Sequence, residues 1–479
     1  MIFSDLVLFQ CRLQPAVTAM CAPGGMFPLI SYGRLEHFIH NIARKAQAQG
    51  IRRGDIVALF IEDKILHAAF ILALNRLGAA AFSVRDFRLP KELNIAAVIS
   101  TKAYRFDNAL RLIIADASWA EGDGTPFEAS SPESDEDLAH IVLTSGTTGE
   151  PKAVGFSHAL IAQRVFHYTW VFGAKASHCS RVFVDPGLST SIGLVSWLGI
   201  LQRGGTVFFR GSVAAETFQA LDLYKIQCMI GPPAALAEFV ALYEQAPGFP
   251  SNLEVIVSTG SFLSATLSER VRARLCSTLI STYGSTETTM TAVAPAHAIA
   301  HVSGAVGYAA PSATIEIVDA GGNIQARGKE GLIRIRSTLN VGGYMGNPPG
   351  SEHAFRDGAF YPGDIGKLTP DGLLIISGRE KSVLNLGGEK VSPERIEQAI
   401  ASFPGISQAA AFSVVNALGI EEICVAVVSE SFNEEALLSH CKRALPAKFI
   451  PAHFRLTDKV PMTPTGKIDR RRLMEFAKS

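Results

Sequence analysis

Residues 143–152 read LTSGTTGEPK, and this stretch decides which class of fold the chain adopts. The apolar run before it, Ala139–Leu143, predicts a strand that feeds a loop rich in glycine and hydroxyl groups. Small residues let backbone N–H groups approach an anion closely, and hydroxyls supply further donors. Lys152 adds a positive point charge. The stretch is therefore typical of a loop that binds a polyphosphate.

The loop differs from a Walker A loop, in which GxxxxGK is followed by Ser or Thr. Here Pro151 precedes the lysine and Ala153 follows it. The alternative is an ordinary polar surface loop. Such loops rarely hold three threonines, a serine, two glycines and a lysine within ten residues. We therefore expect a phosphate site of a different family.

Repeated strand–helix–strand patterns surround this loop. Apolar residues recur at helical spacing from Ser31 to Gly50, which predicts a helix capped by Ser31 and stopped at Gly50. A second helix is predicted to end near Gly78 and another to begin at Pro233. Alternating units of this kind predict an α/β fold with a mostly parallel, helix-covered sheet. The strands are predicted at Asp55–Ile61, Ala79–Val84, Thr206–Arg210, Ile226–Ile230, Glu254–Ser258 and Ser277–Ser281.

The pattern changes to strand pairs from Gly307 onward. The turn sequences GGN at 321–323 and PDG at 370–372 predict antiparallel hairpins, packed beside the main sheets as a hairpin-rich β subdomain. The C-terminal part mixes short strands with helices such as Asn433–Leu445. It is predicted to form a small α+β domain.

Composition limits the class of protein. The 479 residues predict about two to four domains, and 48% apolar residues exclude wholesale disorder. Equal numbers of basic and acidic residues, 44 each, argue against broad nucleic-acid binding. Seven scattered cysteines fit a reducing cytoplasm better than a disulfide framework or a zinc site. We expect no transmembrane segment and no signal peptide, because charged or polar residues interrupt the apolar runs.

Three further segments carry groups suited to a nucleotide. In Ser281–Thr288, Glu287 is suited to magnesium and Tyr283 to stacking on a base. Asp364 and Arg379 are suited to ribose or phosphate, and Lys467 is presented by a Pro-Thr-Gly turn. Taken singly, these residues are equally well explained as a solvated glutamate, a surface ion pair and a tail lysine.

In this order and spacing the segments resemble the adenylate-forming superfamily. It comprises acyl- and aryl-CoA synthetases, the adenylation domains of nonribosomal peptide synthetases, and beetle luciferases. Weaker matches lie at Val257–Ser264 and Leu384–Glu397. The resemblance covers nearly the whole chain, and it is closest in kind to an acyl- or aryl-CoA ligase. It is carried by Thr144–Lys152, Tyr283–Glu287, Gly363-Asp364, Gly378-Arg379 and Pro464–Lys467.

The resemblance implies an active site between a large domain and a mobile lid. An N-terminal domain that binds ATP and the acyl group would span residues 1–378, a hinge 379–383 and the C-terminal lid domain 384–479. Lys381 would be the hinge residue. The lid would swing after the first half-reaction.

The resemblance also implies the chemistry, in which a carboxylic acid is activated by ATP as acyl-AMP and transferred to a thiol, with Mg²⁺ held by Glu287. Thr286 would contact the α-phosphate, and Lys467 would bridge the carboxylate and that phosphate. No general base is needed, because the attacking carboxylate is already ionised at neutral pH. The nucleotide contacts implied are Thr144, Ser145, Gly146, Thr147, Thr148, Gly149, Lys152, Gly260, Ser261, Tyr283, Gly284, Ser285, Asp364 and Arg379.

The acid and the acceptor are less defined. Many relatives gate the acyl pocket with a histidine or aromatic pair, whereas the matching Ser189 and Thr190 carry no ring. Ser191 stands where peptide-synthetase domains place an aspartate for the substrate amino group, which disfavours amino acids. The pocket residues expected are Leu188, Ser189, Thr190, Gly193 and Ser258. These small or aliphatic walls favour a fatty or aromatic acid.

The expected acceptor is CoA. The alternative is a carrier protein on a separate chain, because twelve residues remain after Lys467. A catalytically silent scaffold is a remote alternative, since Lys467, Glu287 and Asp364 are all present.

Overall fold

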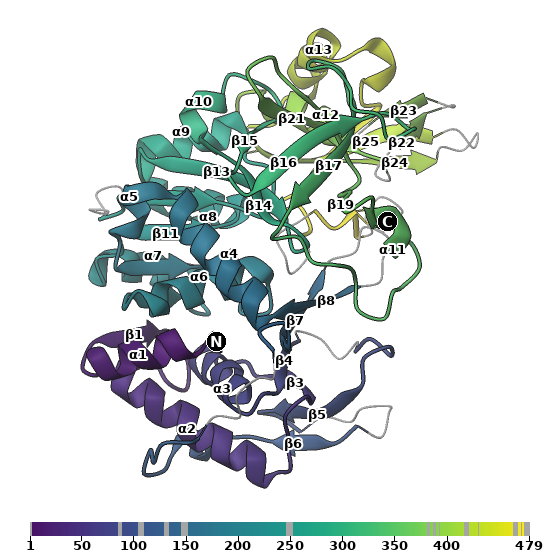
Figure 1. The fold of residues 1–479 in the computed structure, drawn as a ribbon. Coiled ribbons are helices and arrows are strands. Elements are labelled where there is room, and N and C mark those ends of the chain that lie inside the picture. Colours follow the sequence, from purple (N-terminus) through teal and green to yellow (C-terminus); the bar gives the residue numbers. More distant parts are fainter. Residues whose placement is uncertain are drawn as a thin grey trace.

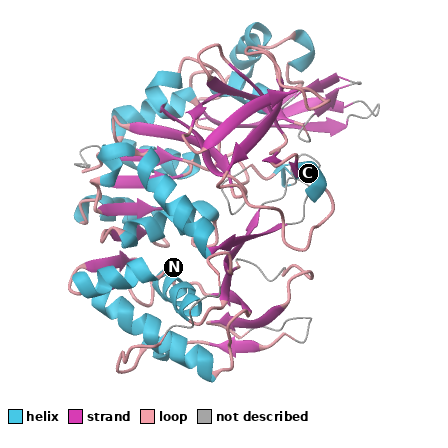
Figure 2. Ribbon diagram, in the orientation of Figure 1, coloured by secondary structure: helices cyan, strands magenta, loops and turns pink. Residues whose placement is uncertain are grey.

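A computed structural model gives the chain as two helix-covered sheets followed by a small C-terminal unit (Figure 1), with helices and strands mixed throughout (Figure 2). This confirms the predicted α/β fold class, with a large N-terminal part and a smaller α+β part at the C-terminus. The structure describes residues 2–84, 89–103, 110–128, 134–144, 152–245, 252–380, 384–386, 389–391, 393–415, 421–429, 431–462, 468–470 and 472–473.

The predicted phosphate loop lies between β7 and β8, the last two strands at one edge of the first sheet. The strand order is β6-β5-β3-β4-β7-β8, in which β7 and β8 are antiparallel and the others pair in parallel. Thr144, the last residue of β7, pairs with Lys152, the first residue of β8. The strands are β3 Ile56–Phe60, β4 Ala80–Ser83, β5 Ile95–Ser100, β6 Leu112–Ile114, β7 Leu138–Thr144 and β8 Lys152–Ser157.

Two helices of this part illustrate how sequence sets local structure. Helix α2 (Tyr32–Ala48) begins at the predicted cap, where the Ser31 hydroxyl accepts a hydrogen bond from the Arg34 amide at 3.3 Å. The chain then leaves the helix through Gly50, whose φ of 76° favours glycine. Helix α3 (Lys64–Arg76) is apolar on all sides and buried along its length. A short 3-10 turn, Ala117–Ala120, packs near α2.

The second sheet begins with the other predicted parallel strands. Strands β1, β10, β9, β11, β12 and β13 are parallel neighbours in that order, and β2 closes the edge. The strands are β1 Thr18–Cys21, β2 Leu29–Ser31, β9 Arg181–Val184, β10 Thr206–Phe209, β11 Cys228–Gly231, β12 Val255–Ser258 and β13 Leu279–Ser285. The helices are α1 Asp5–Leu13, α4 His158–Val171, α5 Gly173–Ser177, α6 Ser191–Gln202, α7 Ala214–Leu223, α8 Pro233–Gln245, α9 Ala265–Arg274 and α10 Ala296–Ile299.

The predicted hairpins form, but their placement differs from the prediction. They continue the second sheet through β13-β14-β15-β21-β20-β17 instead of packing beside it. The reason is that β13 runs on past its parallel partner and turns back as β14, whose free edge then pairs with β15. The remaining elements are β14 Thr289–Pro295, β15 Ala305–Ala309, β16 Ala313–Val318, β17 Gly331–Ser337, α11 Ser351–Ala354, β18 Phe355–Arg356, β19 Ala359–Phe360, β20 Asp364–Leu368 and β21 Leu373–Arg379.

The C-terminal part has a hydrophobic core of its own, which includes Ile396, Val425 and Leu437. It contacts the preceding part through α12, where the Thr266 hydroxyl donates a hydrogen bond to the Ala401 carbonyl at 3.2 Å. Its elements are β22 Leu384–Leu386, β23 Glu389–Val391, α12 Pro393–Ala401, β24 Ile406–Val415, β25 Glu421–Ser429, α13 Glu434–Ala444, the 3-10 turn Ala447–Phe449 and β26 His453–Leu456.

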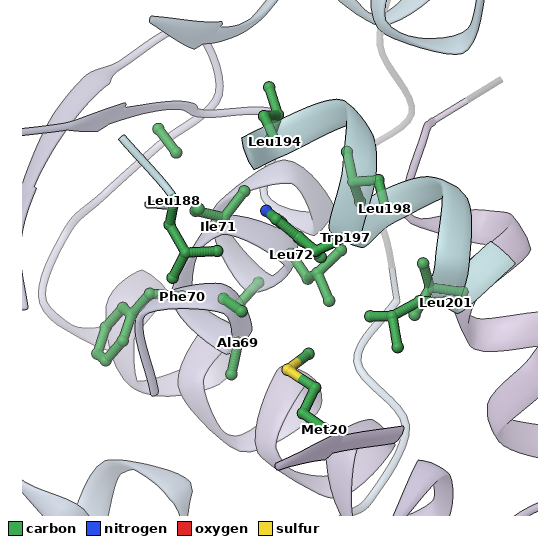
Figure 3. Packing of buried hydrophobic residues seen from close by; sticks show 14 of the residues in the cluster. Met20, Ala69, Phe70, Ile71, Leu72, Leu188, Leu194, Trp197, Leu198 and Leu201 are labelled. Atoms are coloured by element: carbon green, nitrogen blue, oxygen red, sulfur yellow. The ribbon is translucent and has the colours of Figure 1, made fainter. Parts of the chain in front are cut away.

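A continuous core joins the two sheets. Figure 3 shows Phe70, Ile71 and Leu72 of α3 in one cluster with Trp197 and Leu198 of α6. Burying these large side chains is the main stabilising contribution in this region. No helix in the described residues is long and apolar enough to cross a membrane.

Two histidines, His67 of α3 and His140 of β7, are buried. His67 donates a hydrogen bond from Nδ1 to the Ile61 carbonyl, and its Nε2 lies 2.9 Å from the Ser83 hydroxyl. Neither ring nitrogen of His140 has a hydrogen-bond partner in the described structure. Burial lowers the pKa of His67 to about 4 and that of His140 to about 3.

We therefore expect the fold to weaken on acidification. Below pH 6.5 the unfolded chain takes up protons on these histidines, whereas the folded chain does not until about pH 4 and 3. Between pH 7 and 5 each histidine should lower the free energy of unfolding by about 2 kcal/mol. His140→Leu should remove the contribution of His140 to this loss of unfolding free energy. His178→Gln, at an exposed position, should leave the loss unchanged. Thermal unfolding at both pH values tests this, and an unchanged pH dependence in His140→Leu would contradict it.

Candidate active site

Strand β13 and the turn after it carry the tyrosine–glutamate segment. Tyr283, Gly284 and Ser285 lie on the strand itself, not in a loop after it as predicted, because β13 pairs with β14 over its full length. Gly284 is required there, since a Cβ would come within 1.9 Å of the Thr289 carbonyl oxygen. Thr286 and Glu287 form the turn that follows.

Asp364 connects two strands that are distant in sequence. Its Oδ2 accepts a 2.6 Å hydrogen bond from the Tyr283 hydroxyl, and its Oδ1 lies 2.7 Å from Arg379 Nε. Asp364 and Arg379 are direct partners across the β20–β21 hairpin, so the strand register sets this ion pair. Only 4% of Asp364 is exposed. The site is therefore preorganised, with a tyrosine ring beside a buried carboxylate and a guanidinium.

The protonation states of Tyr283, Asp364 and Arg379 depend on one another. Burial, reinforced by the Asp364 carboxylate, raises the pKa of Tyr283 well above its ordinary value. Burial alone would lower the pKa of Arg379, but the negative charge of Asp364, its hydrogen bond and the nearby Tyr283 and Glu394 together raise that pKa. The phenol and guanidinium thus stay protonated and keep their hydrogen-bond donors. A carboxylate can accept more hydrogen bonds than the two that Asp364 accepts from Tyr283 and Arg379. Asp364 can therefore also accept from sugar hydroxyls.

Glu287 is held from one side by Tyr344. The Tyr344 hydroxyl donates to Glu287 Oε1 at 2.7 Å, and Glu287 is 7% exposed. Burial and the neighbouring carboxylate raise the pKa of Tyr344, which therefore remains a donor. Lys152 Nζ lies 4.4 Å from the centre of the Tyr344 ring, so the base of the phosphate loop and Glu287 meet at one tyrosine.

The phosphate loop and the lid lysine are only partly described. Thr144 ends β7 and Lys152 begins β8, but Ser145, Gly146, Thr147, Thr148 and Gly149 lie outside the described residues. So do Lys381 and Lys467. Met462 and Ile468, on either side of Lys467 in the sequence, form an antiparallel bridge.

Residues after β12 lie at the carboxyl edge of the parallel strands. Gly260 has a φ of 89° and open space where a Cβ would stand, with Ser261 next in the chain. Ser258 is buried, and its hydroxyl has no hydrogen-bond partner in the described structure. Thr282 of β13 donates to the Ser258 carbonyl at 3.0 Å, which joins this segment to the tyrosine strand. The carboxyl edge of such sheets is where ligands bind.

The stretch predicted to line the acyl pocket has structural roles. Leu188 is buried in the core beside Phe70 and Ile71 (Figure 3). Thr190 caps helix α6, accepting from the Gly193 amide at 3.0 Å. A Cβ on Gly193 would come within 2.2 Å of a backbone oxygen. Ser189 is half-buried, and a pocket lined by these residues stays a prediction.

Two residues of the site were missed by sequence reasoning. Tyr344 lies more than fifty residues from Glu287, and nothing local links them. Arg164 donates to the backbone carbonyls of Thr286 and Glu287 from the middle of helix α4. An arginine within a helix that holds no other arginine, lysine or carboxylate was the available signal for Arg164.

Comparison with known proteins identifies the family of this chain. The AMP-binding enzyme family model matches residues 9–345, and the AMP-binding enzyme C-terminal domain matches residues 395–467. The chain is 26% identical to 4-chlorobenzoate–CoA ligase of Arthrobacter sp over 98% of this chain and 94% of that protein. It is 26% identical to 2-succinylbenzoate–CoA ligase of Listeria monocytogenes over 97% and 98% of the two chains.

A solved structure gives the same fold. It is o-succinylbenzoate CoA synthetase from Bacillus subtilis in complex with the acyl-adenylate intermediate, with a TM-score of 0.83 and 19% identity over 98% of this chain and 97% of that chain. The predicted adenylate-forming fold is thereby confirmed. Since the family model covers most of the sequence, this chain belongs to the AMP-binding enzyme family.

Proposed function

We propose that this enzyme is an ATP-dependent, AMP-forming acid–thiol ligase whose acceptor is CoA. The observation that carries the proposal is Asp364, buried and bonded to both Tyr283 and Arg379 next to the Glu287 turn. This arrangement suits a nucleoside, with the ring of Tyr283 beside the base and the carboxylate beside the ribose. The residues of the phosphate loop then face the β- and γ-phosphates.

In the first half-reaction a carboxylate oxygen of the acid attacks the α-phosphorus of ATP. The new O–P bond forms as the bond from the α-phosphorus to the bridging oxygen breaks, and pyrophosphate leaves. Thr286 contacts the α-phosphate, and Lys467 bridges that phosphate and the acid. Positioned charges of this kind act where negative charge develops, and they commonly lower a barrier by several kcal/mol.

Glu287 fits a magnesium ion that arrives with ATP. Magnesium is usually bound by one or two carboxylates plus phosphate oxygens and water. The described residues contain no cluster of three or more histidine, cysteine or carboxylate ligands. Of the two buried carboxylates at the site, Asp364 is bonded to Tyr283 and Arg379, which leaves Glu287 for the ion. Bound magnesium neutralises charge on the leaving pyrophosphate.

In the second half-reaction the thiol sulfur attacks the acyl carbon, and AMP leaves. We propose that residues 384–479 form the lid that turns between the two steps about Lys381, within a hinge at 379–383. The separate core of the C-terminal part and its limited contact through α12 support this division. A carrier protein is the alternative acceptor, with the thiol of its phosphopantetheine arm in place of CoA.

Stiffening the hinge should separate the half-reactions. Lys381→Pro fixes φ and restricts the residue before it. We expect thioester formation to fall about tenfold or more, with adenylation within about threefold of the wild type. Lys381→Ala, which keeps backbone freedom, is the control. An equal fall in both half-reactions would show that the hinge lies elsewhere.

The substrate proposed is a fatty or aromatic acid. An aromatic acid is supported by the relatives, whose names give 4-chlorobenzoate and 2-succinylbenzoate as their acids. A cytoplasmic location is supported by the seven cysteines, all of them free and buried.

The direct test is magnesium- and ATP-dependent pyrophosphate release with hydroxylamine trapping, across fatty, aryl and dicarboxylic acids. Release that depends on one acid supports adenylation, and added CoA or a phosphopantetheinylated carrier then identifies the acceptor. A protein that binds ATP and releases no pyrophosphate with any acid would contradict the proposed reaction.

A further inference from the structure

Arg164 is a buried arginine on a helix that holds no other arginine, lysine or carboxylate. It lies in the middle of α4, within ALIAQRVFHY, and 1% of it is exposed. Taking a guanidinium out of water is costly unless its donors are satisfied. Among the described residues no carboxylate lies within ion-pair distance of it, so a salt bridge does not explain its position.

All five N–H groups of the guanidinium have an acceptor. Nη1 donates to the Thr286 carbonyl at 2.8 Å and to the Ser191 hydroxyl at 3.4 Å. Nη2 donates to the Glu287 carbonyl at 2.9 Å. Nη2 and Nε both donate to the Leu339 carbonyl, at 2.7 and 3.1 Å. The plane of the group lies over the ring of Phe156, with its carbon 4.8 Å from the ring centre.

The backbone carbonyls among these acceptors belong to two segments that meet at Glu287. The Glu287 carbonyl also accepts from the Val341 amide at 2.9 Å, so the turn and the 339–341 loop are fastened to each other and to α4. Burial lowers the pKa of Arg164 to about 9, with the Glu287 carboxylate opposing the shift, and the group stays cationic at neutral pH. The positive charge therefore lies at the backbone of the turn, while the Glu287 carboxylate accepts from Tyr344.

We propose that Arg164 is a positioning residue for adenylation, which sets the direction of the Thr286 and Glu287 side chains by fixing their backbone carbonyls. This inference rests on the proposed function, because those side chains matter only if ATP and magnesium bind there. Lysine cannot replace arginine in this role, since it has three donors on one nitrogen and no planar fork. A displacement of about 1 Å at a reacting group commonly lowers a rate about 100-fold.

The test uses Arg164→Lys in the full chain, with pyrophosphate release measured against Mg²⁺ and against ATP. We expect kcat to fall about 30- to 100-fold and the Mg²⁺ concentration for half-maximal activity to rise about tenfold. KM for ATP should change less than about threefold, because the contacts of Asp364 are untouched. Arg334→Lys is the matched control, since Arg334 is also buried but binds Glu316 and the Gly322 carbonyl.

A purely structural role would give a different result. Arg164→Lys would then lose thermal stability while its kcat and Mg²⁺ midpoint stayed within twofold of those of Arg334→Lys, and the inference would be overturned. If Arg164→Lys does not fold, Phe156→Leu removes the ring under the guanidinium, with buried Phe183→Leu as its control. A Mg²⁺ midpoint raised only in Phe156→Leu supports the inference, and no difference between the two contradicts it. Wild-type protein that releases no pyrophosphate would instead refute the proposed function.

Discussion

Replacing Lys467 by alanine is expected to lower acyl-adenylate formation about 10³-fold. The ammonium group would bridge the acid and the α-phosphate, where negative charge is greatest at the transition state. An interaction made mainly in the transition state affects kcat far more than ground-state binding. ATP affinity, measured by titration without the acid, should therefore stay within about threefold of the wild type.

Lys459→Ala is the matched control for this prediction. Lys459 lies in the same C-terminal part and is exposed, so its removal should leave both half-reactions within twofold of the wild type. If Lys467→Ala kept adenylation but lost thioester formation, the lysine would act in the second half-reaction. If it lost ATP binding, its contact would be with the ground-state nucleotide.

Replacing Asp364 by asparagine is expected to raise KM for ATP about 100-fold. The change removes the charge paired with Arg379 at 2.7 Å and the anionic acceptor for the Tyr283 hydroxyl at 2.6 Å. The guanidinium is then left largely buried without its partner, which is the costly half of breaking such a pair. Binding of AMP and ATP by calorimetry, together with steady-state kinetics, measures the effect.

The chain offers a close control for Asp364→Asn. The Tyr308 hydroxyl donates to Asp371 Oδ2 at 2.9 Å, a tyrosine–aspartate pair of the same chemistry that lies in an exposed turn. Exposed pairs contribute little, so Asp371→Asn should leave KM within twofold of the wild type. Equal effects of the two substitutions would mean that Asp364 acts through general stability of the hairpin and not through the nucleotide.

Much of the fold was predictable because local rules and the final structure agree. The helix at Tyr32–Ala48 begins at the serine predicted to cap it, and the strand at Val255–Ser258 lies within the predicted range. The hairpin around residues 370–372 also forms as predicted. In each case the apolar period and the turn residues point to the same element.

Predictions that depended on a distant partner were incomplete. The strand carrying Tyr283 was expected to stop earlier, but pairing with β14 extends it to Ser285. Leu188 was expected at the acyl pocket, yet its side chain packs in the core beside α3. A local sequence pattern indicates where a strand or loop lies. The length of a strand and the direction of a side chain depend on the elements that pack against them.

The order of residues alone predicts the α/β class, the family and the chemistry-bearing segments, because the apolar period and the motifs are local properties of the chain. Which of those residues lie together is set by the packed structure. Asp364 reaches Tyr283 across 81 positions, and Arg164 reaches Thr286 across 122. Such contacts arise when sheets and helices pack, and hydrogen bonds in a buried setting require partners that no local pattern can name.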